Sequence, residues 1–248
     1  RAPKAGVYLT EKRIPKIEIS VHLPTDFDDS IWPMLGWLIG DLSPNKIPLV
    51  TGLEMASPSD DDLKALCAAF GTTSAAPMLH INGHTPGKVY SIPSNLKNFN
   101  ITKQHLAKLW NKFNYADLRV DLVAIGSPHA SLTECQSFVK FFDGKNCNPN
   151  VKTIITIGRD ILSKAKSEGL VEQLRSAGVQ VISDICWCSI TEPIFPPEVS
   201  VIMTNSGKYA HYAHGLTGRK TRFGSLKDCA IAAQSGWAKY ELPEWLSN

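Results

Sequence analysis

The chain has 248 residues, 43% of them hydrophobic and 20% charged, with a formal net charge of +3, which is ordinary for a globular protein of one large or two small domains. Lysines and arginines are scattered, so no nucleic-acid-binding stripe is predicted, and no apolar run reaches the roughly 20 residues of a membrane-spanning helix. Six irregularly spaced cysteines are too few for a disulfide scaffold. They favour a reducing, cytoplasmic compartment in which all six are thiols or ligands.

The first half of the chain predicts alternating strands and helices. Residues 16–23 alternate apolar and polar side chains, which is typical of a strand with one wet face. Caps at 26–29 begin a helix that runs to about Leu42, and further strands are predicted at 47–52 and 77–81, with a helix over 61–70 between them. Turn residues occupy 82–87, a connecting loop is expected over 88–100, and a helix begins at 101–102 and runs to about Phe113.

The second half alternates more regularly. Strands are predicted at 120–125, 151–157, 179–183 and 199–203, and helices at 131–142 and 225–234, with one or two short helices over 159–177 that break at Gly169. This pattern predicts βαβ units around a mainly parallel sheet. The expected fold class is therefore α/β, built from three-layer αβα units. We expect two domains, residues 1–118 and residues 119–248, the second Rossmann-like and carrying most of the site.

Four strands of the second half end in polar side chains. The clusters occupy residues 126–131, 158–160, 184–188 and 204–212. Because the carboxyl ends of parallel strands meet at one edge of a sheet, we expect these clusters to converge on one pocket. Ser131 is equally well explained as a helix cap. Ser127, which precedes Pro128, is more typical of a residue that faces a ligand beside helix-start amides.

Single residues in these clusters also have structural explanations. A lone histidine such as His129 is more often packed or on the surface than catalytic, and Lys208, which follows a glycine turn, could be solvated. Cys186 and Cys188 share a face if the chain is extended there, and at most one of them is expected to be a ligand.

Other enzyme templates fit the sequence poorly. It contains no dinucleotide-binding glycine motif after a strand, no Walker loop, no HExxH motif and no nucleophile elbow. His211 and His214 are spaced to bind a metal ion on a helix, although a loop or helix cap explains them about as well.

Several short motifs are spread along nearly the whole chain, and their order is part of the pattern. They are 48–53 (PLVTGL), 61–66 (DDLKAL), 123–129 (VAIGSPH), 183–186 (SDIC), 204–212 (TNSGKYAHY), 215–216 (GL) and 222–229 (RFGSLKDC). In this set the chain resembles the aconitase X proteins, a divergent branch of the aconitase superfamily. The resemblance implies an aconitase-like fold.

The resemblance also implies an activity. It predicts a hydro-lyase that dehydrates a small hydroxy acid, cis-3-hydroxy-L-proline foremost and mevalonate 5-phosphate as the alternative, with iron, mononuclear or in an iron–sulfur cluster, as Lewis acid. Cys186 would bind the iron as a thiolate. The implied catalytic residues are Ser127, His129 and Lys208, and the implied substrate-binding residues are Asn205, Ser206, Gly207 and Thr51.

Partners follow from the same resemblance. The family's catalytic subunit is longer at its N-terminus and works with a small swivelling domain or subunit, which brings the serine expected to act as base. The chain, which starts at Arg1, is therefore expected to be a fragment, a processed product or a subunit, and inactive alone. The alternative to an enzymatic function is that the chain is a non-catalytic, partner-binding subunit.

Three positions depart from the family. Some relatives carry cysteine where this chain has Ser127, and the serine favours the hydroxyproline type. Cys188 is also unusual for the family and is either a bystander or a substitute ligand, and His84 stands where relatives tend to have an apolar residue.

Overall fold

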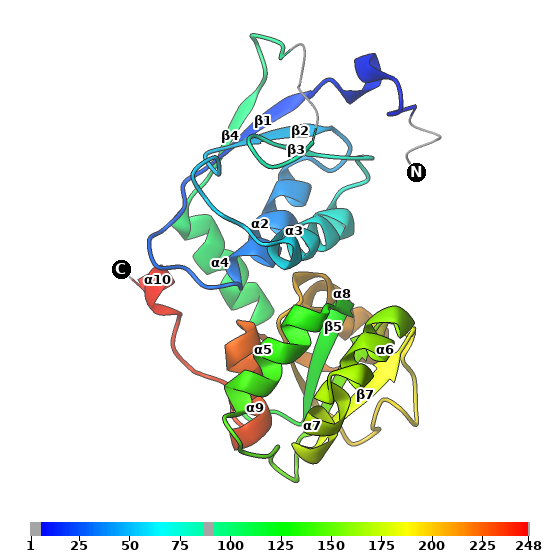
Figure 1. The fold of residues 1–248 in the computed structure, drawn as a ribbon. Coiled ribbons are helices and arrows are strands. Elements are labelled where there is room, and N and C mark those ends of the chain that lie inside the picture. The colour runs from blue at the N-terminus through cyan, green and yellow to red at the C-terminus, as the bar shows by residue number, and fades with distance from the viewer. Residues whose placement is uncertain (1–5, 87–91, 248) are drawn as a thin grey trace. The chain divides into compact units, whose positions relative to one another are not determined.

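The computed structural model describes residues 6–86 and 92–247, and it confirms the predicted α/β class. The chain divides into two compact units (Figure 1): Arg1–Phe27, Ile31–Leu109 and Glu244–Asn248 in the first, and Asp28–Ser30 and Trp110–Pro243 in the second. Each unit contains one sheet, and every strand pairing within both sheets is parallel. Among the described residues, no helix is both long and apolar enough to cross a membrane.

The sheet of the first unit has the strand order β3-β2-β1-β4. Its strands are β1 (Ile17–Val21), β2 (Pro48–Thr51), β3 (His80–Ile81) and β4 (Asn98–Ile101). The helical segments of this unit are η1 (Thr10–Arg13), α2 (Ile31–Leu42), α3 (Asp60–Thr73), α4 (Lys103–Phe113) and α10 (Glu244–Ser247), and α4 passes into the second unit at Trp110. Helices α2 and α3 lie on the same side of this sheet (Figure 1).

Strand β1 has the predicted wet face. Its residues alternate between buried and half-buried along the strand, beginning with buried Ile17. On the half-buried face, Ser20 Oγ lies 3.2 Å from Thr51 Oγ1 of β2 and accepts a 3.1 Å hydrogen bond from Asn98 Nδ2 of β4. This face of the parallel sheet is therefore held by side-chain hydrogen bonds as well as by the backbone ladder.

The prediction of a loop over 88–100 is wrong for its last three residues. They belong to β4, which pairs with β1 in parallel register. Asn98 and Asn100 are exposed, and asparagine is depleted in strands, so the segment has a weak strand signal. Pairing with β1 overrides that local preference. The expected loop residues 88–91, and Gly87 of the predicted turn, lie outside the described residues.

Close packing of α2 on α3 depends on Gly36, which has no side chain. A Cβ atom added at Gly36 would lie 2.0 Å from the backbone oxygen of Leu66. No side chain fits at that distance, so glycine lets the two helix backbones approach. Helix α3 begins at a capping box, in which Ser59 Oγ accepts the Asp62 amide and the Asp62 carboxylate accepts the Ser59 amide.

The sheet of the second unit has the strand order β7-β6-β5-β8-β9. Its strands are β5 (Leu122–Ala130), β6 (Lys152–Ile157), β7 (Val179–Ser183), β8 (Val201–Thr204) and β9 (Lys220–Phe223). Its helices are α5 (Leu132–Phe142), α6 (Arg159–Ser167), α7 (Leu170–Ser176), α8 (Gly207–Thr217) and α9 (Leu226–Ser235), with the short helix η2 (Trp187–Ser189).

Two apolar clusters cover the two faces of this sheet. One joins Val123, Ile155 and Met203 of the strands to α5, α7 and α9. The other joins Leu122 and Ile202 to residues of η2 and α8. Because successive strand residues point to opposite faces, this unit has the three layers that the sequence predicts.

Helix boundaries in the second unit follow local capping signals. Ser131 is the N-cap of α5 and accepts the Glu134 amide at 3.0 Å, which confirms the cap interpretation. Gly169 separates α6 from α7 with a φ of +69°, as predicted. Strand β9 was not predicted, because three of its four residues are the polar Lys220, Thr221 and Arg222.

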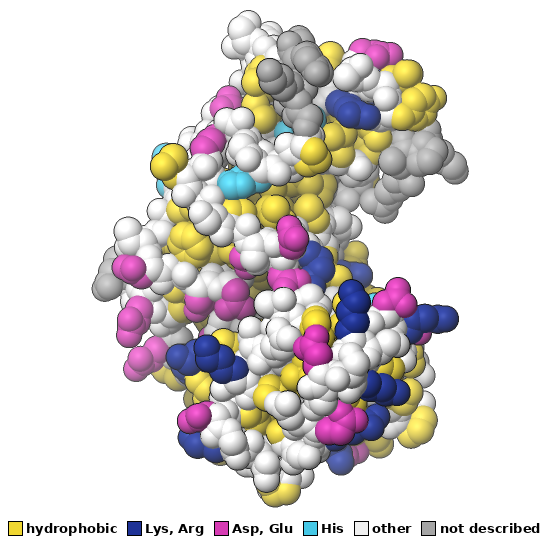
Figure 2. All heavy atoms as spheres, viewed as in Figure 1, with side chains coloured by type: hydrophobic (Ala, Val, Ile, Leu, Met, Phe, Trp, Pro, Cys, Tyr) yellow, Lys and Arg dark blue, Asp and Glu magenta, His cyan; other side chains and the backbone are white. Residues whose placement is uncertain are grey.

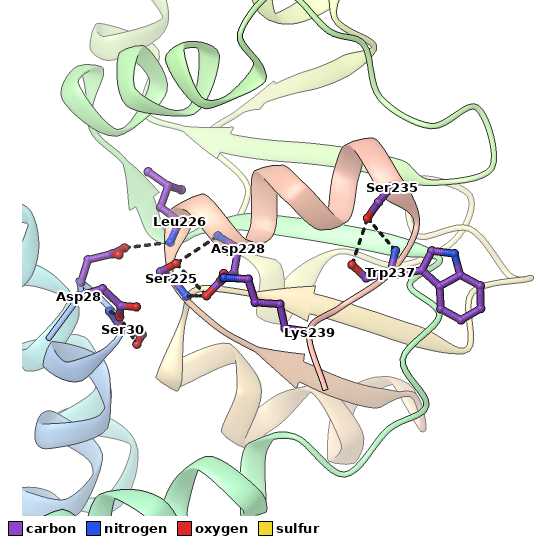
Figure 3. A network of polar contacts seen from close by, with 9 residues as sticks. Asp28, Ser30, Ser225, Leu226, Asp228, Ser235, Trp237 and Lys239 are labelled. Carbon is purple, nitrogen blue, oxygen red and sulfur yellow. Dashed lines mark hydrogen bonds and ion pairs between the residues drawn. The ribbon is translucent and has the colours of Figure 1, made fainter. Parts of the chain in front are cut away.

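Two carboxylates accept hydrogen bonds at the amino end of α9, and Figure 3 labels one of them, that of Asp228. Asp228 accepts the amide and hydroxyl of Ser225 and receives Lys239 Nζ at 2.7 Å. The carboxylate of Asp29 accepts the Leu226 amide at 2.9 Å. Negative charge at this end of a helix is stabilising, which explains why residues 28–30 belong to the second unit.

Candidate active site

Strands β5 and β8 form the point at which the order of the second sheet reverses. The chain runs from β5 outward to β6 and β7, and then returns to β8 and β9 on the other side of β5. Backbone pairing between β5 and β8 covers only Leu122 with Ile202 and Val123 with Met203. In open α/β sheets ligands bind beyond the carboxyl ends of strands at such a reversal. The segments that follow β5 and β8 are therefore the candidate site.

Four consecutive carbonyl groups at the end of β5 each accept a hydrogen bond from a neighbouring side chain. The donors come from β8, η2, β6 and the turn before α8: Thr204 Oγ1 to Ala124 O at 2.8 Å, Trp187 Nε1 to Ile125 O at 2.8 Å, Thr156 Oγ1 to Gly126 O at 2.7 Å, and Ser206 Oγ to Ser127 O. Buried carbonyl groups need partners, and the regular ladder with β8 has ended here. These side chains replace that ladder.

Further contacts join the remaining polar clusters. His129 Nε2 donates to the backbone oxygen of Ile185 at 3.0 Å. Arg159 donates its amide and Nε to the carboxylate of Asp184 at 3.0 and 2.9 Å. Together with the bond from Ser206 to Ser127 O, these contacts confirm that the four predicted strand-end clusters converge.

Ser127 has a buried hydroxyl at the centre of this convergence. The residue is 4% exposed, and among the described residues its Oγ has no hydrogen-bond partner. Buried hydroxyl groups normally have partners, so an unsatisfied one at the carboxyl end of a parallel strand suggests that a bound group completes it. The hydroxyl of Ser127 is thus the best-placed polar atom of β5 for contact with a ligand.

Gly126 allows the bulge that presents Ser127. Its φ is +100°, and a Cβ atom there would lie 2.2 Å from the backbone oxygen of Thr156. We expect Gly126→Ala to lower the free energy of unfolding by about 3 kcal/mol, from backbone strain and overpacking together. Urea denaturation followed by circular dichroism measures this loss. Gly215→Ala is the control, because no atom beyond its chain neighbours and the nearby backbone of its own helix lies within 4 Å of a Cβ there. An equal stability for the two variants would contradict the prediction.

His129 is half-buried and oriented by its bond to Ile185 O. Since the carbonyl oxygen can only accept, Nε2 carries the proton in this contact. In the neutral ring Nδ1 then has the lone pair. This hydrogen bond therefore fixes the tautomer of the neutral His129 ring and links the end of β5 to the residue before Cys186.

The amino end of α8 follows β8 directly. Ser206 is its N-cap, and its Oγ accepts the Tyr209 amide at 3.0 Å while it donates to Ser127 O. Amides in the first turn of a helix, here of Gly207 and Lys208, attract negative charge. Asn205 and Lys208 are half-buried beside this turn, and within the described part of the chain Lys208 has no carboxylate at ion-pair distance. This end of α8 has the charge and donors to bind an anion.

Residues 207–217 are helical, which the sequence left undecided. Tyr209 and Ala213 pack in the core on one side of α8, whereas His211 and His214 are exposed. In residues 6–86 and 92–247, no group of three or more His, Cys, Asp or Glu side chains could hold a metal ion. The two histidines therefore do not form a metal site with other described residues.

Cys186 and Cys188 flank Trp187 in η2. Both cysteines are half-buried, and none of the six cysteines of the chain forms a disulfide. Burial raises the pKa of the Cys188 thiol, and the neighbouring Cys186 raises it further, whereas the Lys208 cation lowers it. The two thiols thus lie near each other and near the amino end of α8.

The remaining site candidates belong to the first unit. Thr51 ends β2, and its hydroxyl contacts Ser20 Oγ at 3.2 Å and donates to Glu18 Oε1 at 3.4 Å. His84 Nε2 donates to the backbone oxygen of Leu53 at 2.7 Å, which gives this unusual residue a structural role.

Sequence reasoning missed three of the donors that reach the β5 carbonyl groups: Thr156 of β6, Trp187 of η2 and Thr204 of β8. Thr156 and Thr204 are completely buried, and Trp187 is 1% exposed. Their only sequence signal is a hydroxyl or indole group at the end of an apolar strand or beside a cysteine. Such a signal does not identify an acceptor 30 to 80 residues away.

Comparison with known proteins identifies relatives of both units. The second-domain model of aconitase X matches residues 15–111, and the third-domain model matches residues 120–235. A cis-3-hydroxy-L-proline dehydratase of Pseudomonas aeruginosa is 38% identical over 254 residues, which cover all of this chain and 44% of the relative. The large subunit of phosphomevalonate dehydratase from Methanocaldococcus jannaschii is 26% identical over 92% of this chain and 57% of its own length.

The fold also matches a solved structure. The holo-form of Thermococcus kodakaraensis aconitase X superposes with a TM-score of 0.81 at 25% sequence identity, covering 91% of this chain and 57% of that one. This chain therefore spans less than half of the bacterial relative and somewhat over half of the solved structure. Two successive domain models, a full-length alignment to this chain and a shared fold agree, and the chain belongs to the aconitase X family.

Proposed function

We propose that this chain supplies the substrate-carboxylate site and an iron-binding thiol of a hydro-lyase that acts on cis-3-hydroxy-L-proline. The carrying observation is the unpartnered hydroxyl of Ser127, which lies beside the first turn of α8 because Ser206 bonds to Ser127 O. The 38% identity to a cis-3-hydroxy-L-proline dehydratase supports the choice of substrate.

The substrate carboxylate would bind at the amino end of α8. The first-turn amides, the Lys208 ammonium group and the Ser127 hydroxyl are donors of the kind that bind carboxylates, and the charged donor strengthens the interaction. Asn205 would add an amide donor from the half-buried position before the cap. Holding the carboxylate in this way also stabilises the negative charge that develops when the adjacent carbon loses its proton.

His129 would hold a proton near the reacting carbon. Its ring is oriented by the bond from Nε2 to Ile185 O, which holds the imidazole at the end of β5. We propose that the base itself belongs to another part of the complete protein, either fused or on a separate subunit. The substrate-binding role that the family resemblance implies for Thr51 stays a prediction.

The donor chemistry of η2 fits iron in part. Soft thiolate ligands suit iron, and Cys186 with its neighbour Cys188 offers two sulfur atoms at the candidate site. Because the described residues contain no group of three or more potential ligands, a complete site needs ligands from elsewhere. We propose Cys186 as the ligand from this chain. Iron bound there would act as a Lewis acid on the leaving hydroxyl group.

Lys208→Met in the complete protein is expected to lower kcat/KM for cis-3-hydroxy-L-proline by about 10- to 100-fold, because a hydrogen bond from a charged donor contributes about 1.5–3 kcal/mol. Steady-state kinetics measures the loss. Lys220→Met is the control, since Lys220 is exposed at the start of β9, the amino-terminal edge of the sheet. Equal kinetics for both variants would show that Lys208 does not contact the substrate.

Mevalonate 5-phosphate is the second candidate substrate, favoured by the similarity to phosphomevalonate dehydratase large subunits. An anaerobic assay of the complete protein with both substrates side by side, and with iron quantified, decides between them. Turnover of mevalonate 5-phosphate alone would reject the hydroxyproline assignment. Turnover of neither substrate by iron-loaded protein would favour a non-catalytic, partner-binding subunit.

A further inference from the structure

The strand order of the first sheet also reverses, between β1 and β4. The chain runs from β1 outward to β2 and β3, and then returns to β4 on the other side of β1. The two strands end side by side, because Val21 pairs with Ile101. Ligands of open α/β sheets bind beyond the carboxyl ends of strands at such a reversal. Residues 22–26, which follow β1, and residues 102–103, which follow β4, therefore lie where a ligand site is expected in the first unit.

A cavity of about 300 Å³ lies at this reversal. Its lining comes from the segment after β1, the first residue of α4 and helix α10: Pro24, Thr25, Asp26, Lys103, Glu244 and Trp245. All six residues belong to the first unit. The volume is at the lower end of the range of small-molecule sites, about 300–1,000 Å³, so the cavity suits a ligand of few atoms.

Trp245 contributes a hydrogen-bond donor that is not used. The residue is 6% exposed, and among the described residues its Nε1 has no hydrogen-bond partner. The indole N–H can only donate, and in buried positions it normally finds an acceptor. None of the other residues that line the cavity supplies one. The unused donor therefore indicates a bound group that offers an acceptor oxygen.

The charged residues of the cavity have both signs. Lys103 is half-buried at the start of α4, where its ammonium group and the first-turn amides favour a negative group. Asp26 and Glu244 are exposed and favour a positive group. In the part of the chain that the structure describes, none of these three side chains has an ion-pair partner. The cavity thus offers free charge of both signs to a ligand.

We infer that this cavity binds a small zwitterionic α-amino acid. Its carboxylate would accept from Lys103 and from Trp245 Nε1, and its ammonium group would donate to Asp26 and Glu244. A simple anion would face the two carboxylates, and a simple cation would face Lys103 and the positive end of α4, whereas a zwitterion matches both sets. The inference goes beyond the proposed function, because it requires neither iron nor turnover.

The test follows the indole N–H signal of Trp245 by nuclear magnetic resonance in the complete protein labelled with nitrogen-15 tryptophan. Loss of one signal in Trp245→Phe assigns it. The probes are glycine, L-alanine and L-serine, together with propionate and ethylamine, which are L-alanine without its ammonium group and without its carboxylate. We expect the amino acids to shift the signal downfield, as a new hydrogen bond does. Propionate and ethylamine should bind at least about 10-fold more weakly, because each lacks one set of charged hydrogen bonds.

Two charge variants locate the ligand. Lys103→Met should weaken binding of the amino acids by about 10- to 100-fold, and Glu244→Gln should also weaken it. Lys108→Met, at an exposed position of the same helix, and Glu241→Gln, also exposed, are the controls and should bind as wild type does.

Three results would overturn the inference. The first is a Trp245 signal that none of the three amino acids shifts. The second is an affinity for propionate equal to that for L-alanine, because the cavity would then select an anion. The third is equal binding by Lys103→Met and Lys108→Met.

Discussion

Replacing Cys186 with serine is expected to remove most of the iron from the complete protein and to lower dehydratase activity by about 100-fold or more. Loss of a residue that only hydrogen-bonds to a metal ligand costs about 10- to 100-fold, and loss of a ligand itself should cost at least as much. Serine keeps the size of the side chain but lacks a sulfur donor, and its hydroxyl does not ionise near neutral pH. Iron content and turnover of cis-3-hydroxy-L-proline are the measurements. Because Cys186 is half-buried at the start of η2, the exchange should leave the fold intact.

Cys147 provides the matched control for this experiment. It is also half-buried, and burial raises the pKa of its thiol, but its amide bonds to Ala177 O, away from η2. Cys147→Ser should therefore keep both iron and activity. Full iron occupancy and normal turnover in Cys186→Ser would reject Cys186 as the ligand.

Trp187→Ala is expected to lower the free energy of unfolding by about 3–5 kcal/mol, the range for removing a large aromatic side chain from a core. Trp187 is 1% exposed, packs on Tyr209, and donates to the buried oxygen of Ile125. The alanine variant loses the packing and leaves that oxygen without its donor. Urea denaturation followed by circular dichroism measures the change without relying on the fluorescence of the removed indole.

Trp187→Phe separates the two contributions. Phenylalanine retains most of the aromatic packing but cannot donate to Ile125 O, so a loss of about 1–3 kcal/mol is expected from the unsatisfied acceptor. The exposed Trp237, which is 57% accessible, serves as the control position. If Trp187→Ala were no less stable than Trp237→Ala, the proposed anchoring of η2 would be wrong.

Much of the fold could be predicted from local patterns. Apolar runs such as 151–157 and 179–183 became β6 and β7, and the capping serine Ser131 begins a helix as expected. The two unpredicted strands have weak strand signals, since two of the four β4 residues are asparagine and three of the four β9 residues are polar. Pairing with a neighbouring strand overrides these weak local preferences. No window of local sequence contains that information.

Only part of the candidate site could be predicted from local sequence patterns. Polar residues after apolar strands are visible in the sequence, and parallel pairing predicts that Ser127, His129 and Lys208 come to one sheet edge. The role of each remains a prediction. Whether 207–217 is a loop or a helix could not be decided locally, because the core packing of Tyr209 and Ala213 stabilises α8.

The sequence by itself determined the parallel α/β class, the strand ends that bear polar side chains, and the family. Only the tertiary structure decided that β5 lies next to β8, and that Thr204, Trp187 and Thr156 hold the end of β5 in place of a backbone ladder. It also decided that the hydroxyl groups of Ser127 and Tyr209 are buried without partners among the described residues. The physical reason is range: propensity and periodicity act over a few residues, whereas a buried polar atom is satisfied by whichever distant segment the packed core places beside it.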